Sequence, residues 1–215
     1  MSKISKIYEN IIEENEHIDD KLHFFFNLLL TTELEEITES RFTTVFILKM
    51  FHAFLHGANI DIIIEEIKNL EKLDKNYRRT KPATLFNGNH LKGLWHKHYE
   101  NNSLRDMALN IGTQLKFSKT FNKEALAIFN NSSLSAQEKV SKLSYLASGK
   151  QYLERIDEGR LTGNWIIYHI HDGKNYYLNI NTGKHVGKDE ILAREIRDIT
   201  LFEFPFIKGD LPIFS

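Results

Sequence analysis

The sequence contains no cysteine among its 215 residues. This absence excludes disulfide bonds, thiolate metal ligands and a cysteine nucleophile, and it is compatible with a reducing compartment. Long apolar runs are also missing, because the run from Phe24 to Leu30 is broken by Asn27 and falls short of the roughly 20 residues of a membrane span. The first residues lack the apolar region of a secretory signal. We therefore expect a cytoplasmic protein with no membrane partner.

Signatures of several large enzyme classes are absent as well. The chain has no Walker A motif, no GxGxxG, no GxSxG and no EF-hand loop, which argues against nucleotide-driven motors, Rossmann enzymes and α/β-hydrolases. His52 and His56 have the i,i+4 spacing of a zinc-binding helix, but Ala53 stands where the HExxH motif requires Glu. A zincin is therefore excluded.

What is present is the composition of an ordinary globular protein, with 41% apolar and 27% charged residues. No internal repeat or polar linker divides the chain, so we expect a single domain over residues 1–215. Within it we expect a helical part at 1–157 and a small β-containing part at 158–215. Apolar residues at helical spacing predict helices in the first part, at 5–16, 20–30, 41–56, 60–75, 104–115, 122–129 and 135–156.

The period of the sequence changes after Gly163. Segments 164–170 and 174–180 are aromatic and β-branched, and Asp172-Gly173 between them predicts a β-hairpin. Segment 189–198 predicts a short helix, and 199–207 predicts a third strand with Pro205 at its edge. The expected fold class is α+β, with a mainly helical N-terminal two-thirds, a small C-terminal antiparallel hairpin or sheet, and one short helix.

Charge is divided unevenly along the chain. Residues 1–75 hold 8 Lys and Arg against 15 Asp and Glu, a net charge of −7, whereas residues 76–124 hold 9 against 3, a net charge of +6. A local basic segment can attract an anionic ligand even though the whole chain has a net charge of −1. The alternative is that the basic segment docks on the acidic helices of its own chain.

The basic segment includes residues 77–102, which lack helical periodicity and contain Pro82, Gly88 and Gly93. This pattern predicts a loop or short irregular elements, and long loops in compact proteins are often functional. Within it, His96 and His98 flank Lys97, and two histidines beside a lysine can supply the base, the acid and the cation of phosphodiester cleavage. The alternative is a lid packed on the core.

The predicted hairpin adds His169 and His171, which project to the same side of a strand because of their i,i+2 spacing. The candidate catalytic residues are thus His96, Lys97, His98, His169 and His171. Cationic side chains can bind phosphate groups, and aromatic rings can stack on unpaired bases. On this basis the candidate substrate-binding residues are Arg78, Arg79, Lys92, Trp95, Tyr99, Lys174 and Tyr176. His185 is a further acid or base candidate. The alternative is that the hairpin aromatics are core and His169 merely faces solvent.

Metal binding is not predicted, and no cofactor is expected. The histidines at 52/56, 96/98 and 169/171 form pairs, and each pair supplies at most two ligands where a catalytic zinc ion takes three from the protein. A metal site would require residues that only the fold can bring together.

The first functional hypothesis is a protein that binds or cleaves RNA or another phosphodiester without a metal. A small C-terminal sheet bearing His, Lys and Tyr after helices resembles the architecture of compact bacterial ribonuclease toxins, an analogy of architecture alone. One alternative is a non-enzymatic interaction protein, such as an immunity or phage-defence component, whose acidic helical half covers a basic protein partner. A second alternative is a histidine-ligated metalloenzyme.

Overall fold

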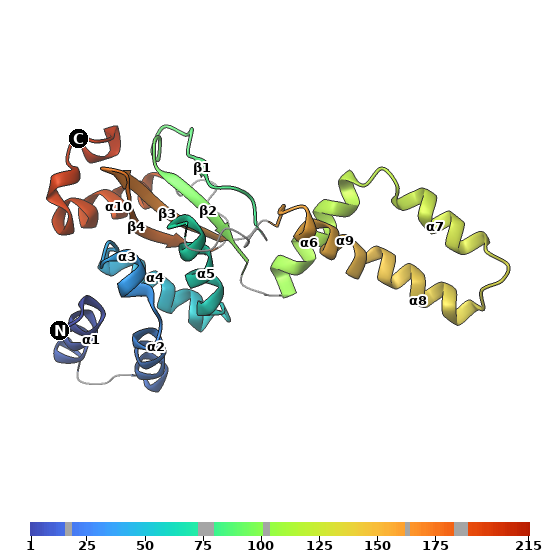
Figure 1. The fold of residues 1–215 in the computed structure, drawn as a ribbon, viewed down its shortest axis with the longest axis horizontal. Coiled ribbons are helices and arrows are strands. Elements are labelled where there is room, and N and C mark those ends of the chain that lie inside the picture. Colours follow the sequence, from blue (N-terminus) through green and yellow to red (C-terminus); the bar gives the residue numbers. More distant parts are fainter. Residues whose placement is uncertain (16–18, 73–79, 101–103, 162–163, 183–188) are drawn as a thin grey trace.

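The computed structural model describes residues 1–15, 19–72, 80–100, 104–161, 164–182 and 189–215 (Figure 1). These residues form a mainly helical α+β fold with a small antiparallel sheet, which confirms the predicted fold class. The first helices are α1 (Lys3–Glu14), α2 (Asp20–Leu30), α3 (Leu34–Thr38), α4 (Thr44–Leu55) and α5 (Ile60–Leu70). They are followed by β1 (Thr84–Leu85), β2 (Trp95–Tyr99), α6 (Leu104–Phe117), α7 (Phe121–Asn130), α8 (Ala136–Ala147) and α9 (Gly149–Asp157). The chain then forms β3 (Asn164–His171), β4 (Lys174–Asn181), α10 (Asp189–Glu203) and the 3₁₀ helices η1 (Pro205–Ile207) and η2 (Pro212–Phe214).

Side-chain caps fix where several N-terminal helices begin. Asp19 accepts a hydrogen bond from the Lys21 amide at the start of α2, and Asn59 accepts one from the Asp61 amide at the start of α5. Such caps satisfy amide groups that have no partner inside the helix. The caps thus place the first turn of α2 directly after Asp19 and that of α5 directly after Asn59.

The sheet has the strand order β1-β2-β3-β4 with antiparallel neighbours. β3 and β4 form the predicted hairpin, and its turn residues Asp172 and Gly173 have positive φ angles of 48° and 74°, as a tight two-residue turn requires. β2 pairs with β3 so that His96 lies opposite Ile167 and His98 lies opposite Trp165. The hairpin therefore carries the remaining strands on its β3 edge.

Two apolar cores lie on opposite faces of this sheet, as the alternation of side chains along strands demands. Helices α1–α5 cover one face, and α10 with η1 and η2 covers the other (Figure 1). On the first face Ile166 and Tyr168 of β3 join the helical core, whereas on the second Ile167 packs against the C-terminal elements. Consecutive residues of β3 thus link the two halves of the protein.

The segment between β2 and β3 forms an arm of four helices, α6–α9, which extends away from the sheet (Figure 1). Its contact between α6 and α9 is polar, because Arg155 Nε donates a hydrogen bond to Asn110 Oδ1 over 3.1 Å. No residue of α7 is buried, and the side chains of Phe117 and Phe129 are largely exposed. The arm therefore has little apolar core of its own.

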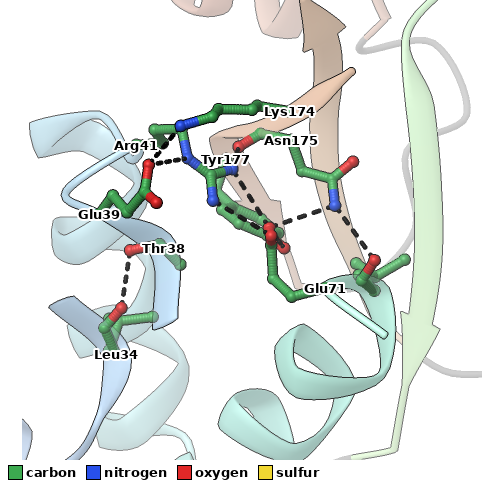
Figure 2. Close-up of polar contacts among 9 residues, drawn as sticks. Leu34, Thr38, Glu39, Arg41, Glu71, Lys174, Asn175 and Tyr177 are labelled. Carbon is green, nitrogen blue, oxygen red and sulfur yellow. Dashed lines mark hydrogen bonds and ion pairs between the residues drawn. The ribbon is translucent and has the colours of Figure 1, made fainter. Parts of the chain in front are cut away.

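A polar network joins the N-terminal helices to the hairpin (Figure 2). The carboxylate of Glu71, just after α5, accepts hydrogen bonds from the Tyr177 hydroxyl at 2.7 Å, from Arg41 Nη2 at 3.1 Å and from Asn175 Nδ2 at 3.2 Å. Burial and the neighbouring Glu71 charge raise the pKa of Tyr177 well above its ordinary value. Nearby, Lys174 forms an ion pair with Glu39 over 2.6 Å.

Three local predictions need correction. Residues 84–85 and 95–99 are strands, where a loop or short irregular elements were predicted. β2 pairs with the hairpin and β1 pairs with β2, and this pairing organises a stretch that has little periodicity of its own. The expected strand at 199–207 is wrong, since α10 continues to Glu203 and η1 follows; Thr200, Phe204 and Ile207 are buried at helical spacing, a pattern that a short apolar run does not distinguish from a strand. The expected helix at 135–156 is divided at Ser148 into α8 and α9.

Every helix in the described part of the chain is too short or too polar to cross a lipid bilayer.

Candidate metal centre

Two elements bring three potential metal ligands together at the hairpin end of the sheet. His169 and His171 lie on the face of β3 that α10 and the C-terminal segment cover, because i,i+2 residues of a strand share a face. Asp210 lies between η1 and η2, directly after Gly209, whose φ of 90° turns the chain back toward the sheet. The carboxylate thereby reaches both imidazoles.

The distances among these side chains are short. Asp210 Oδ2 lies 2.8 Å from His169 Nε2 and 2.5 Å from His171 Nδ1. One ligand atom from each of the three residues lies within 4.8 Å of the others. Among the described residues this is the one group of three or more His, Asp or Glu side chains arranged to hold a metal ion.

The three side chains open onto a hollow of about 430 Å³, which Gly93, Trp95 and Asp172 also line. His169 is the most enclosed, with 7% of its side chain exposed, and Phe214 packs edge-on against its ring. Asp210 retains 26% exposure. The described lining of the hollow contains the carboxylates of Asp172 and Asp210 but neither Lys nor Arg. The hollow is therefore suited to a cation.

Protonation states also suit metal coordination. Burial lowers the pKa of His169, and the hydrogen bond and charge of Asp210 oppose this shift only in part. Burial acts to raise the pKa of Asp210, but hydrogen bonds from His169 and His171 outweigh it and hold the pKa below its ordinary value. A neutral imidazole and an ionised carboxylate are the forms that bind metal ions.

An ion would require the carboxylate to move. With ligand atoms 2.0–2.2 Å from a tetrahedral ion, neighbouring ligand atoms are about 3.4 Å apart. Asp210 Oδ2 is closer than this to both imidazoles, so the carboxylate would move away from both rings to admit an ion between them. Two histidines and a carboxylate suit Zn²⁺ or Fe²⁺ and leave coordination positions open toward the hollow.

The β2 histidines share the sheet face with His169 but occupy a different environment. His96 and His98 pack with Trp165, with ring centroids 4.9 Å and 6.0 Å from that ring, and Phe86 covers His96 at 4.4 Å. Neither is among the described residues that line the hollow. The sequence prediction that each pair projects to one side agrees with the strands, but the two pairs do not surround a common hollow.

Lys97 is turned to the opposite face of β2 and is buried there. Its ammonium group donates hydrogen bonds to Thr80 Oγ1 at 2.7 Å and to the Lys81 carbonyl at 2.8 Å, and it pairs with Glu66 over 3.2 Å. Burial raises the pKa of Glu66, while Lys97 and Thr80 oppose the rise. Tyr99 is also fully buried on this face, and burial raises its pKa. Neither Lys97 nor Tyr99 is among the described residues that line the hollow at His169; Lys97 lines a separate hollow of about 570 Å³ together with Thr80.

The remaining predicted substrate-binding residues are scattered. Trp95 lines the hollow beside His169, and Lys92 lines a neighbouring one. Lys174 forms an ion pair with Glu39, and Tyr176 packs against Phe204 and Phe206. The predicted residues Arg78, Arg79 and His185 lie outside the described residues.

Sequence reasoning missed Asp210 as a partner of the hairpin histidines. It lies 39 residues after His171 in a segment with no metal-binding spacing, and no local signal could have identified it. Comparison with known proteins finds no family model, no curated protein and no solved structure that matches this chain.

Proposed function

We propose that His169, His171 and Asp210 bind one divalent transition-metal ion and that the protein uses it as a metal-dependent hydrolase. The observation that carries this proposal is the convergence of three ligand atoms within 4.8 Å at the wall of an open hollow. A divalent ion with an open coordination position can bind a water molecule and lower its pKa to about 7, which makes hydroxide available at neutral pH.

The charge of the hollow favours this mechanism over metal-independent proton transfer. A phosphodiester approaching the bare site would meet the carboxylates of Asp172 and Asp210 with no Lys or Arg among the described lining residues. Like charges disfavour that approach, whereas a divalent ion would reverse the sign of the local potential. The histidines then act as ligands, since an imidazole nitrogen that coordinates a metal is unavailable as a general base.

A phosphodiester such as RNA remains the proposed substrate class. A metal ion would supply the positive charge that the described lining of this hollow lacks, since Lys97 is paired with Glu66 on the opposite face of β2. Trp95 borders the hollow, but its ring stacks on Tyr168 at a centroid distance of 6.3 Å, on the sheet face that α1–α5 cover. An ion held by His169, His171 and Asp210 would activate a water molecule as the nucleophile. Hydrolysis would form a P–O bond to the water oxygen and break a P–O bond of the ester, and the alkoxide would leave as the alcohol after taking a proton from water.

Metal binding is tested by stripping the protein with a chelator and titrating it with Zn²⁺ or Mn²⁺ in a calorimeter. We expect about one ion per chain for the wild type and a loss of affinity of at least 10-fold for His171→Ala and for Asp210→Asn. Asp172→Asn is the matched control, because it removes an exposed carboxylate 3.5 Å from His171 that is not part of the ligand set. Equal binding by wild type and Asp210→Asn would remove the proposed site.

Hydrolysis is tested separately on bis(4-nitrophenyl) phosphate and on single-stranded RNA. The metal-loaded protein is expected to cleave, and the chelated protein and His171→Ala are expected not to. A protein that binds one metal ion but cleaves neither substrate would leave the metal site standing and contradict its assignment as a phosphodiester hydrolase.

The alternative of an interaction protein stays a prediction that rests on the net charge of −7 over residues 1–75. Its proposed partner is a basic protein surface, which pairs favourably with carboxylates at low salt. The test is binding to a basic model protein at salt concentrations between 50 and 300 mM. If the two proteins do not bind, or if the affinity does not change with salt, the result would count against this alternative.

A further inference from the structure

A second hollow, of about 460 Å³, has a charge opposite to that of the candidate metal centre. It is lined by Lys92 from the loop before β2 and by Arg194 and Arg197 from α10, whereas Glu190 is the one carboxylate in its described lining. The three cationic side chains and the one carboxylate give a net charge of +2. The metal hollow holds two carboxylates, so the two hollows present opposite signs to a ligand.

The two hollows adjoin across a single tight contact. Lys92 and Pro212 line the basic hollow, while the residues next to each of them in the chain, Gly93 and Leu211, line the metal hollow. Gly93 has a φ of 92°, and a Cβ atom there would lie 2.7 Å from Cδ2 of Leu211. The close approach of these two residues forms the ridge between the hollows.

The arginines of the basic hollow are placed to bind an exchangeable anion. Arg194 and Arg197 are three residues apart on α10, so their side chains lie on one side of the helix. Their ion pairs are exposed contacts, with Glu190 at 3.7 Å and with Asp198 at 3.0 Å. Exposed pairs of this kind contribute little, whereas a guanidinium group can bind a phosphate through two parallel hydrogen bonds.

We propose that the basic hollow binds a phosphate of the same strand whose scissile phosphodiester lies at the metal centre, so that the substrate is a single-stranded oligonucleotide. This inference rests on the proposed function. Arg194, Arg197 and Lys92 then position the strand, and a substrate with one phosphate would engage only one of the two hollows. Lys92 was a candidate substrate-binding residue from the sequence, whereas the two arginines of α10 were not.

The test measures binding of a fluorescent single-stranded RNA oligonucleotide to the metal-loaded protein by anisotropy at several salt concentrations. For Arg194→Ala/Arg197→Ala we expect at least 10-fold weaker binding, and the slope of log affinity against log salt should fall by about 0.7, since the hollow is proposed to bind one phosphate and each neutralised phosphate of a single strand contributes about 0.7. The control is Lys123→Ala/Lys142→Ala, which removes two charges from exposed positions of the arm. It is expected to bind within about 2-fold of the wild type.

Further measurements distinguish a strand phosphate from a free phosphate as the ligand of the basic hollow. They also distinguish failure of the strand proposal from failure of the proposed metal site. Inorganic phosphate and a mononucleotide should bind at least 10-fold more weakly than the oligonucleotide, and equal affinity would show a single-anion site and overturn the strand proposal. Arginine and control variants that lose the same affinity, or an arginine variant that binds like the wild type, would also overturn it. Metal affinity should be unchanged in Arg194→Ala/Arg197→Ala. Suppose that Asp210→Asn binds metal like the wild type, while Arg194→Ala/Arg197→Ala no longer binds the oligonucleotide. That result would contradict the proposed metal site and support the basic hollow as an oligonucleotide-binding site.

Discussion

His171 Nδ1 lies 2.5 Å from Asp210 Oδ2, although 39 residues separate the two in the chain. The same oxygen atom contacts His169 Nε2, so the C-terminal segment and strand β3 meet at one carboxylate. A metal ion at this point would bridge the sheet and the segment that follows α10. Metal binding should therefore affect the stability of the protein as well as its chemistry.

We expect saturating Zn²⁺ to raise the thermal midpoint of the chelated wild-type protein. A ligand that binds only the folded state at 100 times its dissociation constant stabilises it by about 2.7 kcal/mol, which corresponds to a shift of about 5 °C for a chain of this size. Asp210→Asn should lose most of the shift, and Asp172→Asn should retain it. Differential scanning calorimetry with and without metal measures both, and an equal shift in Asp210→Asn would contradict the prediction.

A second comparison separates the two histidine pairs in hydrolysis. His171→Ala should reduce phosphodiester cleavage by at least 100-fold because it removes a proposed ligand, as the loss of a metal-centred nucleophile would. His96→Ala should retain activity within about 5-fold, since His96 packs against Trp165 and does not line the hollow. Initial rates with metal in excess give the comparison. The reverse result would restore the sequence-based assignment of the catalytic groups to β2.

The buried ion pair between Lys97 and Glu66 gives a prediction about stability. The two side chains are 4% and 0% exposed, so Lys97→Met should leave an uncompensated buried carboxyl group and destabilise the fold by about 3–5 kcal/mol. The double variant Lys97→Met/Glu66→Leu should recover much of this loss, because it removes both polar groups. Urea unfolding of the three proteins measures the coupling, and a loss in the double variant larger than in the single one would contradict it.

The network in Figure 2 predicts how stability depends on alkaline pH. Burial and the Glu71 charge raise the pKa of Tyr177, so above about pH 10 the unfolded chain releases this proton while the folded chain retains it. Stability from this group is complete below pH 10 and falls as pH rises toward the folded pKa. Burial raises the pKa of Tyr99 and Tyr168 in the same direction. Tyr177→Phe should therefore flatten, without abolishing, the fall in unfolding free energy between pH 10 and 11.

The same variant tests the network at neutral pH. Tyr177→Phe removes the donor that lies 2.7 Å from Glu71 Oε1, and loss of one hydrogen bond to a charged group should destabilise the fold by about 1.5–3 kcal/mol. Equal unfolding free energies at pH 7 would show that Arg41 and Asn175 satisfy Glu71 without the hydroxyl.

Local stability should differ sharply between the arm and the sheet. No residue of α7 is buried, whereas Ile166 and Ile167 of β3 are completely buried. Segments with few buried apolar contacts open with a low free energy. Amide hydrogen exchange followed by mass spectrometry should show α7 and α8 exchanging at least 100-fold faster than β3, and similar protection of both would contradict this expectation.

Local sequence alone determined the caps, the hairpin and the helical character of the first half. Asp19, Asn59 and the Asp172-Gly173 turn act on backbone groups within a few residues, so their effect is readable without the rest of the chain. The i,i+2 spacing of His169 and His171 likewise fixed that they share a strand face. Two of the three side chains of the candidate site could therefore be grouped from the sequence.

Tertiary structure decided the rest. Whether Lys97 faced solvent or Glu66 depended on which face of β2 the helices covered, and the strand itself formed because the hairpin offered an edge to pair with. Asp210 meets the two histidines only because α10 crosses the sheet face and Gly209 turns the chain back. These contacts join residues that are far apart in the sequence, and they are stabilised by the burial of apolar side chains of β3 and β4. The residues near Asp210 contain no local pattern that predicts this burial.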